Sequence, residues 1–303
     1  MPPKMSGKVV LITGAARGIG AQTARELARR GATLSLIGLE PGELEAVAEE
    51  LGEGHTWFEA DVTDPDSLQA AVEATAAAHG RIDAVIANAG LAPFGTVRSG
   101  DPHSFTKTID VNLNGVFHTA RLALPYVIEQ RGYILVVSSL SAFAPIGGMA
   151  AYTASKAGAE ALASALASEV GHLGVAVGSA HPSWIDTDLV RDASADLPSF
   201  RRMRQRLPWP MHATTTVEQC GTAFADAVQR RARRVYVPRP IMLMHWLRNL
   251  PASKLVARLM APTVRKLMPQ MEREVASLGR SLSERNQTLQ GSPKQDAAEH
   301  SRG

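Results

Sequence analysis

The feature that most constrains the fold is a glycine-rich turn between an apolar run and an amphipathic run. Residues 8–12 (KVVLI) have the length and composition of a buried strand, and residues 13–20 (TGAARGIG) follow directly. Residues 21–30 then place apolar side chains at helical spacing. Glycines let a backbone approach a pyrophosphate, and a helix N-terminus attracts its negative charge. This stretch therefore predicts a strand–turn–helix unit that binds phosphate groups.

Apolar runs and helical stretches alternate over most of the chain. The further strand candidates are residues 33–37, 56–60, 82–86, 134–137, 174–178 and 234–238, and the helix candidates are residues 41–51, 67–79, 105–123, 152–170 and 217–229. This alternation is typical of α/β proteins, because a helix returns the chain to the start of the next parallel strand. We predict a doubly wound, Rossmann-like parallel sheet of about seven strands with helices on both faces.

A tyrosine and a lysine lie four positions apart in the alanine-rich helix candidate. Such residues share one face of a helix, so we expect the Lys156 ammonium near the Tyr152 hydroxyl. An unperturbed tyrosine has a pKa of about 10, and a nearby positive charge lowers it toward working pH. Ser139, at the end of the preceding strand candidate, is placed to hydrogen-bond the same substrate oxygen. These residues predict a site that moves a proton to or from an alcohol or a carbonyl.

Several motifs occur together in the order of one enzyme family. The glycine turn reads TGxxxGxG, residues 87–90 read ANAG, residues 111–115 read VNLNG, and Ser139 precedes the YxxxK pair by thirteen positions. This set resembles the short-chain dehydrogenase/reductase family over residues 8–238, with Ala87 where the family has asparagine. The resemblance implies a dinucleotide-binding and catalytic domain in residues 1–240. It also implies an enzyme that interconverts a secondary alcohol and a ketone with a nicotinamide cofactor.

The resemblance assigns a role to each catalytic residue. Tyr152 would be the general acid or base, Lys156 would lower its pKa and bind the nicotinamide ribose, and Ser139 would polarise the carbonyl. Asn112 would hold a water of the proton relay. The alternative for Asn112 is a buried asparagine that bonds the local backbone.

The same resemblance implies a set of cofactor contacts. Asp61 would cap the adenine pocket, and residues 181–187 (HPSWIDT) are similar to the PGxxxT segment that holds the nicotinamide carboxamide. The Ile185 backbone and the Thr187 hydroxyl are the candidates for that contact. The expected cofactor residues are Gly14, Arg17, Gly18, Ile19, Gly20, Gly38, Asp61, Val62, Asn88, Ala89, Gly90, Tyr152, Lys156, Pro182, Ile185 and Thr187. No metal site is predicted.

The end of the second strand candidate bears on the choice between NADP(H) and NAD(H). An acidic residue there would hydrogen-bond the ribose 2′-hydroxyl of NAD, whereas a nearby arginine would suit a 2′-phosphate. The deciding position is Gly38, which is neither acidic nor basic, and Arg17 lies in the glycine turn. NADP(H) is therefore favoured. NAD(H) is the alternative, with Glu40 as the residue that would reach its ribose.

Two later segments have no clear counterpart in the family pattern. Residues 188–213 are expected to form a lid of loop and helix, with arginines at positions 201, 202, 204 and 206 that face solvent. Residues 241–280 are expected to form amphipathic helices on the core or a partner subunit, and contact with a membrane surface is less favoured. We expect both segments to wall a deep pocket for a bulky lipophilic substrate. Residues 281–303 are polar and expected to be disordered.

Composition argues against several other classes of protein. The formal net charge of +3 is too small to indicate a nucleic-acid partner. The single cysteine, Cys220, suits a reducing compartment because it allows no intrachain disulfide. No signal peptide or membrane-spanning window is apparent, so a cytoplasmic protein is expected. The family resemblance implies a homodimer or homotetramer, built through the helices that carry Asn112 and Lys156.

The sequence is compatible with two other functions. Basic stretches at residues 201–206 and 230–239 would attract an acidic carrier, as in a 3-oxoacyl-carrier-protein reductase. A non-catalytic nucleotide-binding regulatory protein is the other alternative. The complete set of Ser139, Tyr152 and Lys156 argues against it.

Overall fold

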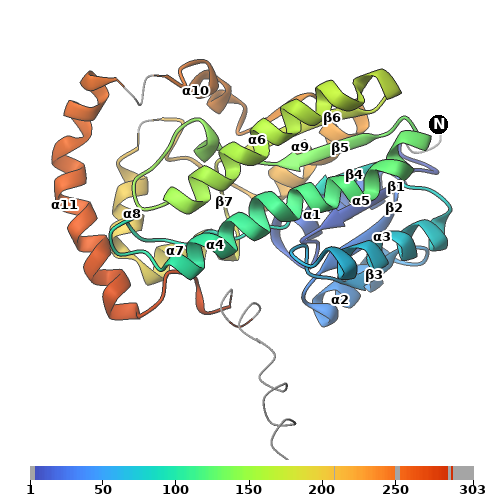
Figure 1. Cartoon of the computed structure of the whole chain (residues 1–303), viewed down its shortest axis with the longest axis horizontal. Helices are drawn as coiled ribbons and strands as arrows, with labels where there is room; N and C mark the ends of the chain where they lie inside the picture. The colour runs from blue at the N-terminus through green and yellow to red at the C-terminus, as the bar shows by residue number, and fades with distance from the viewer. Residues whose placement is uncertain (1–3, 208, 250–252, 286–287, 289–303) are drawn as a thin grey trace, which may run out of the picture.

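A seven-stranded parallel sheet forms the centre of the molecule (Figure 1). The computed structural model describes residues 4–207, 209–249, 253–285 and 288 of the chain. The strands of the sheet are β1 (Val9–Thr13), β2 (Thr33–Gly38), β3 (Thr56–Glu59), β4 (Ala84–Ala87), β5 (Tyr133–Val137), β6 (Ala176–Pro182) and β9 (Arg234–Val237). The predicted fold class is confirmed, and the strand ends differ from the predicted ones by at most four residues.

The strand order is β3-β2-β1-β4-β5-β6-β9. The chain builds the sheet outward from β1 in one direction and then returns to β4 to extend it in the other. The order therefore reverses between β1 and β4, which pair in parallel with Leu11 opposite Val85. In open sheets of this kind, ligands bind beyond the carboxyl ends of the strands at the point of reversal.

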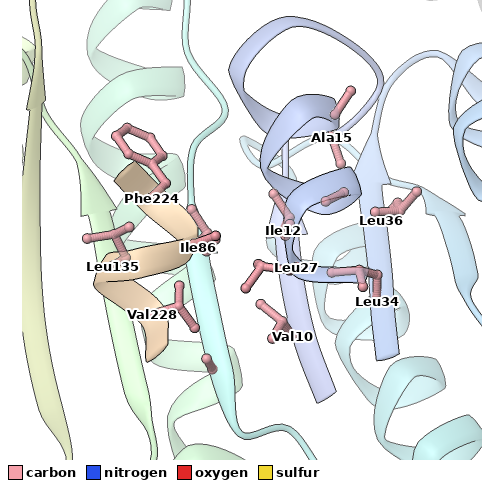
Figure 2. Close-up of a cluster of buried hydrophobic side chains, with 14 of the residues drawn as sticks. Val10, Ile12, Ala15, Leu27, Leu34, Leu36, Ile86, Leu135, Phe224 and Val228 are labelled. Carbon is pink, nitrogen blue, oxygen red and sulfur yellow. The ribbon is translucent and has the colours of Figure 1, made fainter. Parts of the chain in front are cut away.

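Helices cover both faces of the sheet. One face carries α1 (Gly18–Arg29), α2 (Pro41–Leu51) and α9 (Val217–Arg230), and the other carries α3 (Pro65–His79), α5 (Gly115–Glu129) and α6 (Ala150–Val170). Figure 2 shows the first face, where Leu27 of α1 and Phe224 of α9 pack on strand side chains such as Ile12 and Leu135. Strands buried on both faces explain the near-continuous apolar runs in the sequence.

Polar caps determine where several helices start. Asp64 accepts hydrogen bonds from Asp66 N and Ser67 N at the start of α3. Thr216 accepts one from Gln219 N at the start of α9. These side chains satisfy amide groups that have no partner inside the helix.

The helix expected over residues 105–123 is divided in three. It comprises α4 (Pro102–Ile109), a π-helical turn (Asp110–Asn114) and α5. The turn contains Asn112, whose side chain forms hydrogen bonds with the backbone of Leu91 in the loop after β4. The sequence pattern did not predict this turn, which accompanies hydrogen bonds to a residue 21 positions earlier in the chain.

The lid forms two short helices rather than one. They are α7 (Asp188–Asp196) and α8 (Pro198–Gln205), flanked by a two-stranded pairing of β7 (Trp184–Ile185) with β8 (Thr214–Thr215). The side chain of Phe200 is fully buried, with ring centroids 4.7 Å from Phe94 and 5.4 Å from Trp184. The expected apolar side of the lid therefore faces inward.

Among the described residues after β9, the chain forms a short 3-10 helix (Arg239–Ile241) and the α-helices α10 (Met242–Trp246) and α11 (Lys254–Leu278). The second half of α11 packs against the lid through Leu267, Met271 and Val275, and Figure 1 shows the helix outside α8. None of the helices in the described part of the chain has the length and apolar content needed to cross a bilayer.

The segment after α11 differs from its expected disorder over its first residues. Ser281 accepts a hydrogen bond from Phe94 N at 2.8 Å, and Leu282 is buried with the core of α5 and α6. Arg280 also bonds Asp196 and the carbonyl of Leu282. These contacts hold residues 281–285 against the body. Residues 286–287 and 289–303 of the expected disordered tail lie outside the described part of the chain.

Candidate active site

The glycine turn lies at the carboxyl end of β1 and leads directly into α1. Gly14 and Gly18 have φ values of 64° and 54°, which favour glycine. A side chain on Gly20 would collide with the carbonyl of Gly14. No side chain caps the N-terminus of α1. The first amide groups of that helix therefore remain available for an anionic group, as the sequence predicted for a pyrophosphate.

The ends of β1 and β4 are joined by side-chain hydrogen bonds. Asn88 Nδ2 donates to the carbonyls of Thr13 and Gly14, both at 3.0 Å. Thr13 Oγ1 accepts from the amides of Asn88 and Ala89 at 3.1 and 3.3 Å. The ANAG motif thus holds the glycine turn in place at the point where the strand order reverses.

Tyr152 and Lys156 share one face of α6, as their spacing predicts. The Lys156 ammonium is 5.8 Å from the centre of the Tyr152 ring and donates to the carbonyl of Val137 at 2.8 Å. Lys156 is only 4% exposed, and burial lowers its pKa to about 8. Burial raises the pKa of Tyr152, and a hydrogen bond from Ser139 opposes that rise. The lowering of the tyrosine pKa by Lys156 stays a prediction, and it requires the protonated lysine.

The two serines that end β5 have different partners. Ser139 lies beside Tyr152, and its hydroxyl oxygen accepts from Ser141 N at 3.1 Å. Ser138 Oγ donates to the Lys156 carbonyl at 2.8 Å, which fixes the first turns of α6 to the end of the strand. Ser139 therefore stands beside Tyr152 in the wall of the cleft, as its predicted role requires, whereas Ser138 positions the helix.

Asn112 lies behind the cleft rather than in its wall. Its side chain donates to Leu91 O and Ser155 Oγ and accepts from Leu91 N, at 2.9 to 3.0 Å. The alternative interpretation of a buried asparagine that bonds the backbone thus describes its side chain. A Cβ on Gly90 would lie 3.2 Å from both Asn112 Oδ1 and Lys156 Nζ. Asn112 therefore borders the polar space around the lysine.

His181 is buried behind Ser139. It exchanges a 3.0 Å hydrogen bond with Ser179 Oγ, and its ring stacks on that of Tyr236 at 5.4 Å. Burial lowers the pKa of His181 to about 3, so the ring stays neutral at physiological pH. These contacts indicate a structural role for the histidine.

The segment from Pro182 to Thr187 crosses the end of β6 beside the glycine turn. A Cβ on Gly18 would lie 3.4 Å from the Thr187 methyl group. The Thr187 hydroxyl and amide both point to the Ile185 carbonyl, at 3.4 and 2.8 Å. The buried hydroxyl of Ser183 has no hydrogen-bond partner among the described residues. Pro182, Ile185 and Thr187 of this segment line the cleft, and their contact with a nicotinamide stays a prediction.

The opposite end of the cleft is bordered by the ends of β2 and β3. Gly38 leaves space there, while Asp61 accepts a hydrogen bond from Thr63 N at 2.8 Å. Arg17 forms an ion pair with Glu40. The arginine expected to favour NADP(H) and the glutamate expected to favour NAD(H) are therefore in contact. The Nε atom of Arg17 is buried and has no hydrogen-bond partner among the described residues.

One continuous cleft connects these parts. Most expected site residues line it: Gly14, Arg17, Gly18, Ile19, Gly38, Asp61, Val62, Asn88, Ala89, Gly90, Ser139, Tyr152, Lys156, Pro182, Ile185 and Thr187. Gly20 lies under the turn and Asn112 behind the wall. The structure therefore brings the proposed proton-transfer residues and the phosphate-binding turn to one site.

Sequence reasoning missed the contribution of the segment after α11 to this cleft. Ser283 and Arg285 line it, and Arg285 Nη1 donates to Asp188 Oδ2 at 3.0 Å. Arg285 lies close enough to Arg17 to contribute to lowering its pKa, after burial. The segment is polar in sequence and carries no motif, so only its position in space reveals it.

Beyond Tyr152 the cleft becomes apolar. The side chains that line this part are Leu91, Phe94, Ile146, Met149, Leu189, Val190 and Phe200. No residue of α11 is among the described residues that line the cleft. The expectation that lid and tail jointly wall the pocket is therefore met by the lid alone. The second half of α11 instead supports the lid from outside, because Met271 packs against the cluster that contains Phe200.

Comparisons with known proteins agree with this geometry. The model of the short chain dehydrogenase family matches residues 8–198. An uncharacterized oxidoreductase of Mycobacterium tuberculosis (strain CDC 1551 / Oshkosh) is 32% identical over 262 residues, which cover 77% of this chain and 95% of the relative.

Two solved structures have the same architecture, each with a TM-score of 0.70. A 3-ketoacyl-(acyl-carrier-protein) reductase from Brucella melitensis, complexed with NADH, is 27% identical and matched over 97% of its length. Levodione reductase is 28% identical and matched over 96% of its length, and each match covers 77% of this chain. The family match and the relatives show that the chain belongs to the short-chain dehydrogenase/reductase family of oxidoreductases.

Proposed function

We propose that the protein interconverts a secondary alcohol and a ketone with a nicotinamide cofactor, and that Tyr152 transfers the proton. The observation that supports this most directly is the single cleft that contains Ser139, Tyr152, Lys156 and the glycine turn. A nicotinamide whose pyrophosphate lies at that turn would supply or accept the hydride. A non-catalytic binding role is not favoured, because the chain belongs to a family of oxidoreductases and keeps these side chains.

Each side chain has a distinct part in this mechanism. Tyr152 donates its proton to the carbonyl oxygen during reduction and removes it from the alcohol during oxidation. Ser139 hydrogen-bonds the same oxygen, and Lys156 orients the nicotinamide ribose while its charge favours the tyrosinate. Asn112 is assigned a relay water in the polar space that it shares with Lys156 beside Gly90. Ser138 keeps α6 in register with β5 through its bond to the Lys156 carbonyl.

We further propose that NADP(H) is preferred over NAD(H). Arg17 and Arg285 bring two guanidinium groups to the same side of the cleft, and no carboxylate occupies position 38. Glu40 opposes this preference, because it neutralises part of the charge of Arg17. A 2′-phosphate would have to compete with Glu40 for the arginine. Glu40→Gln should therefore lower the Michaelis constant for NADPH, and Gly38→Asp should shift preference toward NADH.

The test of the reaction is cofactor consumption over a panel of aliphatic, aromatic and steroid ketones, with NADPH and NADH compared at each. A rate that depends on ketone and disappears in Tyr152→Phe supports the proposal. Cofactor binding without turnover of any ketone or alcohol would contradict it. A lower Michaelis constant for NADH than for NADPH would overturn the cofactor preference alone and would assign Glu40 to the ribose.

The apolar end of the cleft supports a bulky lipophilic substrate. Its walls are aliphatic and aromatic side chains supplied by the lid, by the loop before α6 and by the loop after β4. Burial of apolar surface stabilises a ligand by roughly 25 cal/mol for each Å². The Michaelis constant should therefore fall as the alkyl part of the ketone grows. An unchanged constant across a chain-length series would argue against this substrate class.

A carrier-bound acyl substrate is the second candidate. It is favoured by the exposed arginines of α8, Arg201 and Arg202, which lie on the lid above the apolar end of the cleft. An acidic carrier would then be attracted to the lid surface. Turnover of a carrier-bound 3-oxoacyl group at lower concentration than its free thioester, with loss of that difference in high salt, would support this substrate.

We also propose that the protein self-associates through α4 and α5. Two phenylalanines are exposed on this face, Phe105 at 45% and Phe117 at 47%. Exposed aromatic side chains are enriched at interfaces between subunits. Phe117→Asp should lower the molar mass measured by light scattering, whereas a monomeric unmodified protein would contradict the proposal.

A further inference from the structure

The apolar stripe of α11 is only half covered by protein. Val256, Met260, Val264, Leu267, Met271 and Val275 follow one another at intervals of three or four residues, which places them on one face of the helix. Leu267, Met271 and Val275 are buried against the lid. Met260 and Val264 on the same face are exposed. The stripe therefore continues past the edge of the body without a partner among the described residues.

Exposed apolar residues of α10 extend this surface. Leu243 is 55% exposed and Trp246 is 79% exposed, although α10 itself is anchored. Its buried His245 packs against the ring of Phe143 at 5.0 Å, and Met244 packs in the cluster around Ile241. The anchored side of the helix is thus distinct from the side that carries Trp246. Figure 1 shows α10 and the first turns of α11 at the same end of the molecule.

The lid contributes a second tryptophan near this surface. Trp209 is 68% exposed, and two residues later Met211 packs in the same cluster as Met244 of α10. The Met211 carbonyl also accepts a hydrogen bond from Trp184, which stands on the wall of the cleft. We call the set formed by Trp209, Met242, Leu243, Trp246, Leu247, Leu259, Met260 and Val264 the apolar rim. The rim adjoins the lid over the candidate substrate site.

The exposed charges around the apolar rim are basic, although the buried carboxylate of Glu160 on α6 lies 3.8 Å from Arg248. Between Asp226 and Glu272 the sequence has no acidic residue, yet it contains ten lysines and arginines. Those in and around α10 and α11 are Arg239, Arg248, Lys254, Arg258, Arg265 and Lys266, and all six are exposed. The acidic residues of α11 begin where the helix meets the body: Glu272 bonds Arg98 and Thr96, and Glu274 accepts from Ser199 N. The helix thus changes from basic and open to mixed and packed.

We propose that the apolar rim and its basic residues bind the surface of an anionic lipid bilayer. Exposed tryptophans suit the boundary between headgroups and acyl chains, and basic amphipathic helices lie in that layer with their apolar side inserted. A second copy of this chain fits less well, because a two-fold contact would place the same basic residues against one another. Docking would bring the lid and the apolar end of the cleft next to the lipid phase. This inference extends the proposed lipophilic substrate but does not depend on it.

The experiment is sedimentation of the full chain with vesicles of phosphatidylcholine alone and of phosphatidylcholine with phosphatidylglycerol. We expect binding to the mixed vesicles, weak binding to the neutral ones, and loss of binding as salt is added. Arg258→Glu and Arg265→Glu should each weaken the partition coefficient about fivefold or more, because a cation near an anionic surface contributes about 1 kcal/mol. Leu243→Asp should weaken it further, because it removes inserted apolar surface.

Matched controls separate this surface from general effects. Leu173 is an exposed leucine at the other end of the sheet, before β6, and Leu173→Asp should leave vesicle binding unchanged. Trp246 fluorescence supplies a readout that needs no destabilising change. Mixed vesicles should shift its emission to the blue, and the shift should shrink in Trp246→Phe. Turnover of a water-soluble ketone should be the same in all these variants, since none of the changed side chains lines the cleft.

Three results would overturn the proposal. The first is no sedimentation with mixed vesicles at low salt, and the second is binding that Leu243→Asp and Arg258→Glu leave unchanged. The third is a dimer that Trp246→Ala converts to a monomer while vesicle binding is absent, which would assign the apolar rim to a second copy. Vesicle binding by a protein that turns over no ketone would support this inference and contradict the proposed function, so the two fail separately.

Discussion

The cleft at the carboxyl ends of the strands buries a charged side chain, whereas the C-terminal helices expose large apolar ones. At the cleft, Lys156 is buried with a lowered pKa and donates to Val137. On α10 and α11, Trp246 and Leu259 are 79% and 70% exposed beside unburied arginines. Burying a charge and exposing an indole are both unfavourable for a chain folding alone. Each exception therefore marks a place where something outside the chain is expected: a reacting substrate at the first, and a lipid surface at the second.

The largest effect is expected on turnover in Tyr152→Phe, at the cleft. The change removes only the hydroxyl that transfers the proton, so turnover should fall by about 10²–10⁴-fold. Cofactor binding, followed by the fluorescence of the reduced nicotinamide, should change little. Tyr126→Phe is the matched control, because that half-buried tyrosine of α5 packs against the core and does not line the cleft. Near-normal turnover by Tyr152→Phe would remove Tyr152 from the mechanism.

The two halves of α11 each carry a methionine, one buried and one exposed, so the same substitution can be compared in both halves. Met271 is fully buried against the lid, whereas Met260 is 36% exposed on the same face of the helix. Met271→Ala should lower the free energy of unfolding by about 2–5 kcal/mol, while Met260→Ala should change it by less than about 0.5 kcal/mol. Chemical denaturation measures both. Equal losses would mean that the first half of the helix is also covered by protein in solution.

The buried lysine makes stability depend on pH. Its folded pKa of about 8 lies below the ordinary lysine value of 10.5, so folding favours the neutral form. The free energy of unfolding should therefore rise with pH between about 8 and 10.5, because the unfolded chain binds more protons there. In Lys156→Met this rise should be smaller by on the order of 1–3 kcal/mol. Denaturation at pH 8 and pH 10 tests it, and identical slopes in both proteins would contradict the assigned burial.

The smallest of these effects concerns Arg285, which lies where the C-terminal segment reaches the cleft. If its guanidinium meets the anionic part of the cofactor, Arg285→Ala should raise the Michaelis constant for the cofactor about tenfold and leave kcat nearly unchanged. Arg273→Ala, at an exposed position on α11, is the control. An unchanged Michaelis constant would mean that Arg285 pairs with Asp188 and does not contact the cofactor.

Much of the cleft could be predicted because its motifs act over short distances in the chain. The glycine turn needs only the strand before it and the helix after it, and a spacing of four places Tyr152 and Lys156 on one face of any helix. Asn112 was found as a residue, but the π-helical turn around it was not. That turn accompanies bonds to Leu91 and Ser155, which lie 21 and 43 positions away in the chain.

Periodicity and spacing along the chain were enough to predict the alternation of strands and helices, the glycine turn and the amphipathic character of α11. The fold was needed to show which half of the α11 stripe is covered, that Arg17 meets Glu40, and that Arg285 reaches the cleft. Burial and ion pairing depend on where distant segments end in space. A pattern can therefore show that a surface must be covered, but only the fold shows how far the protein covers it.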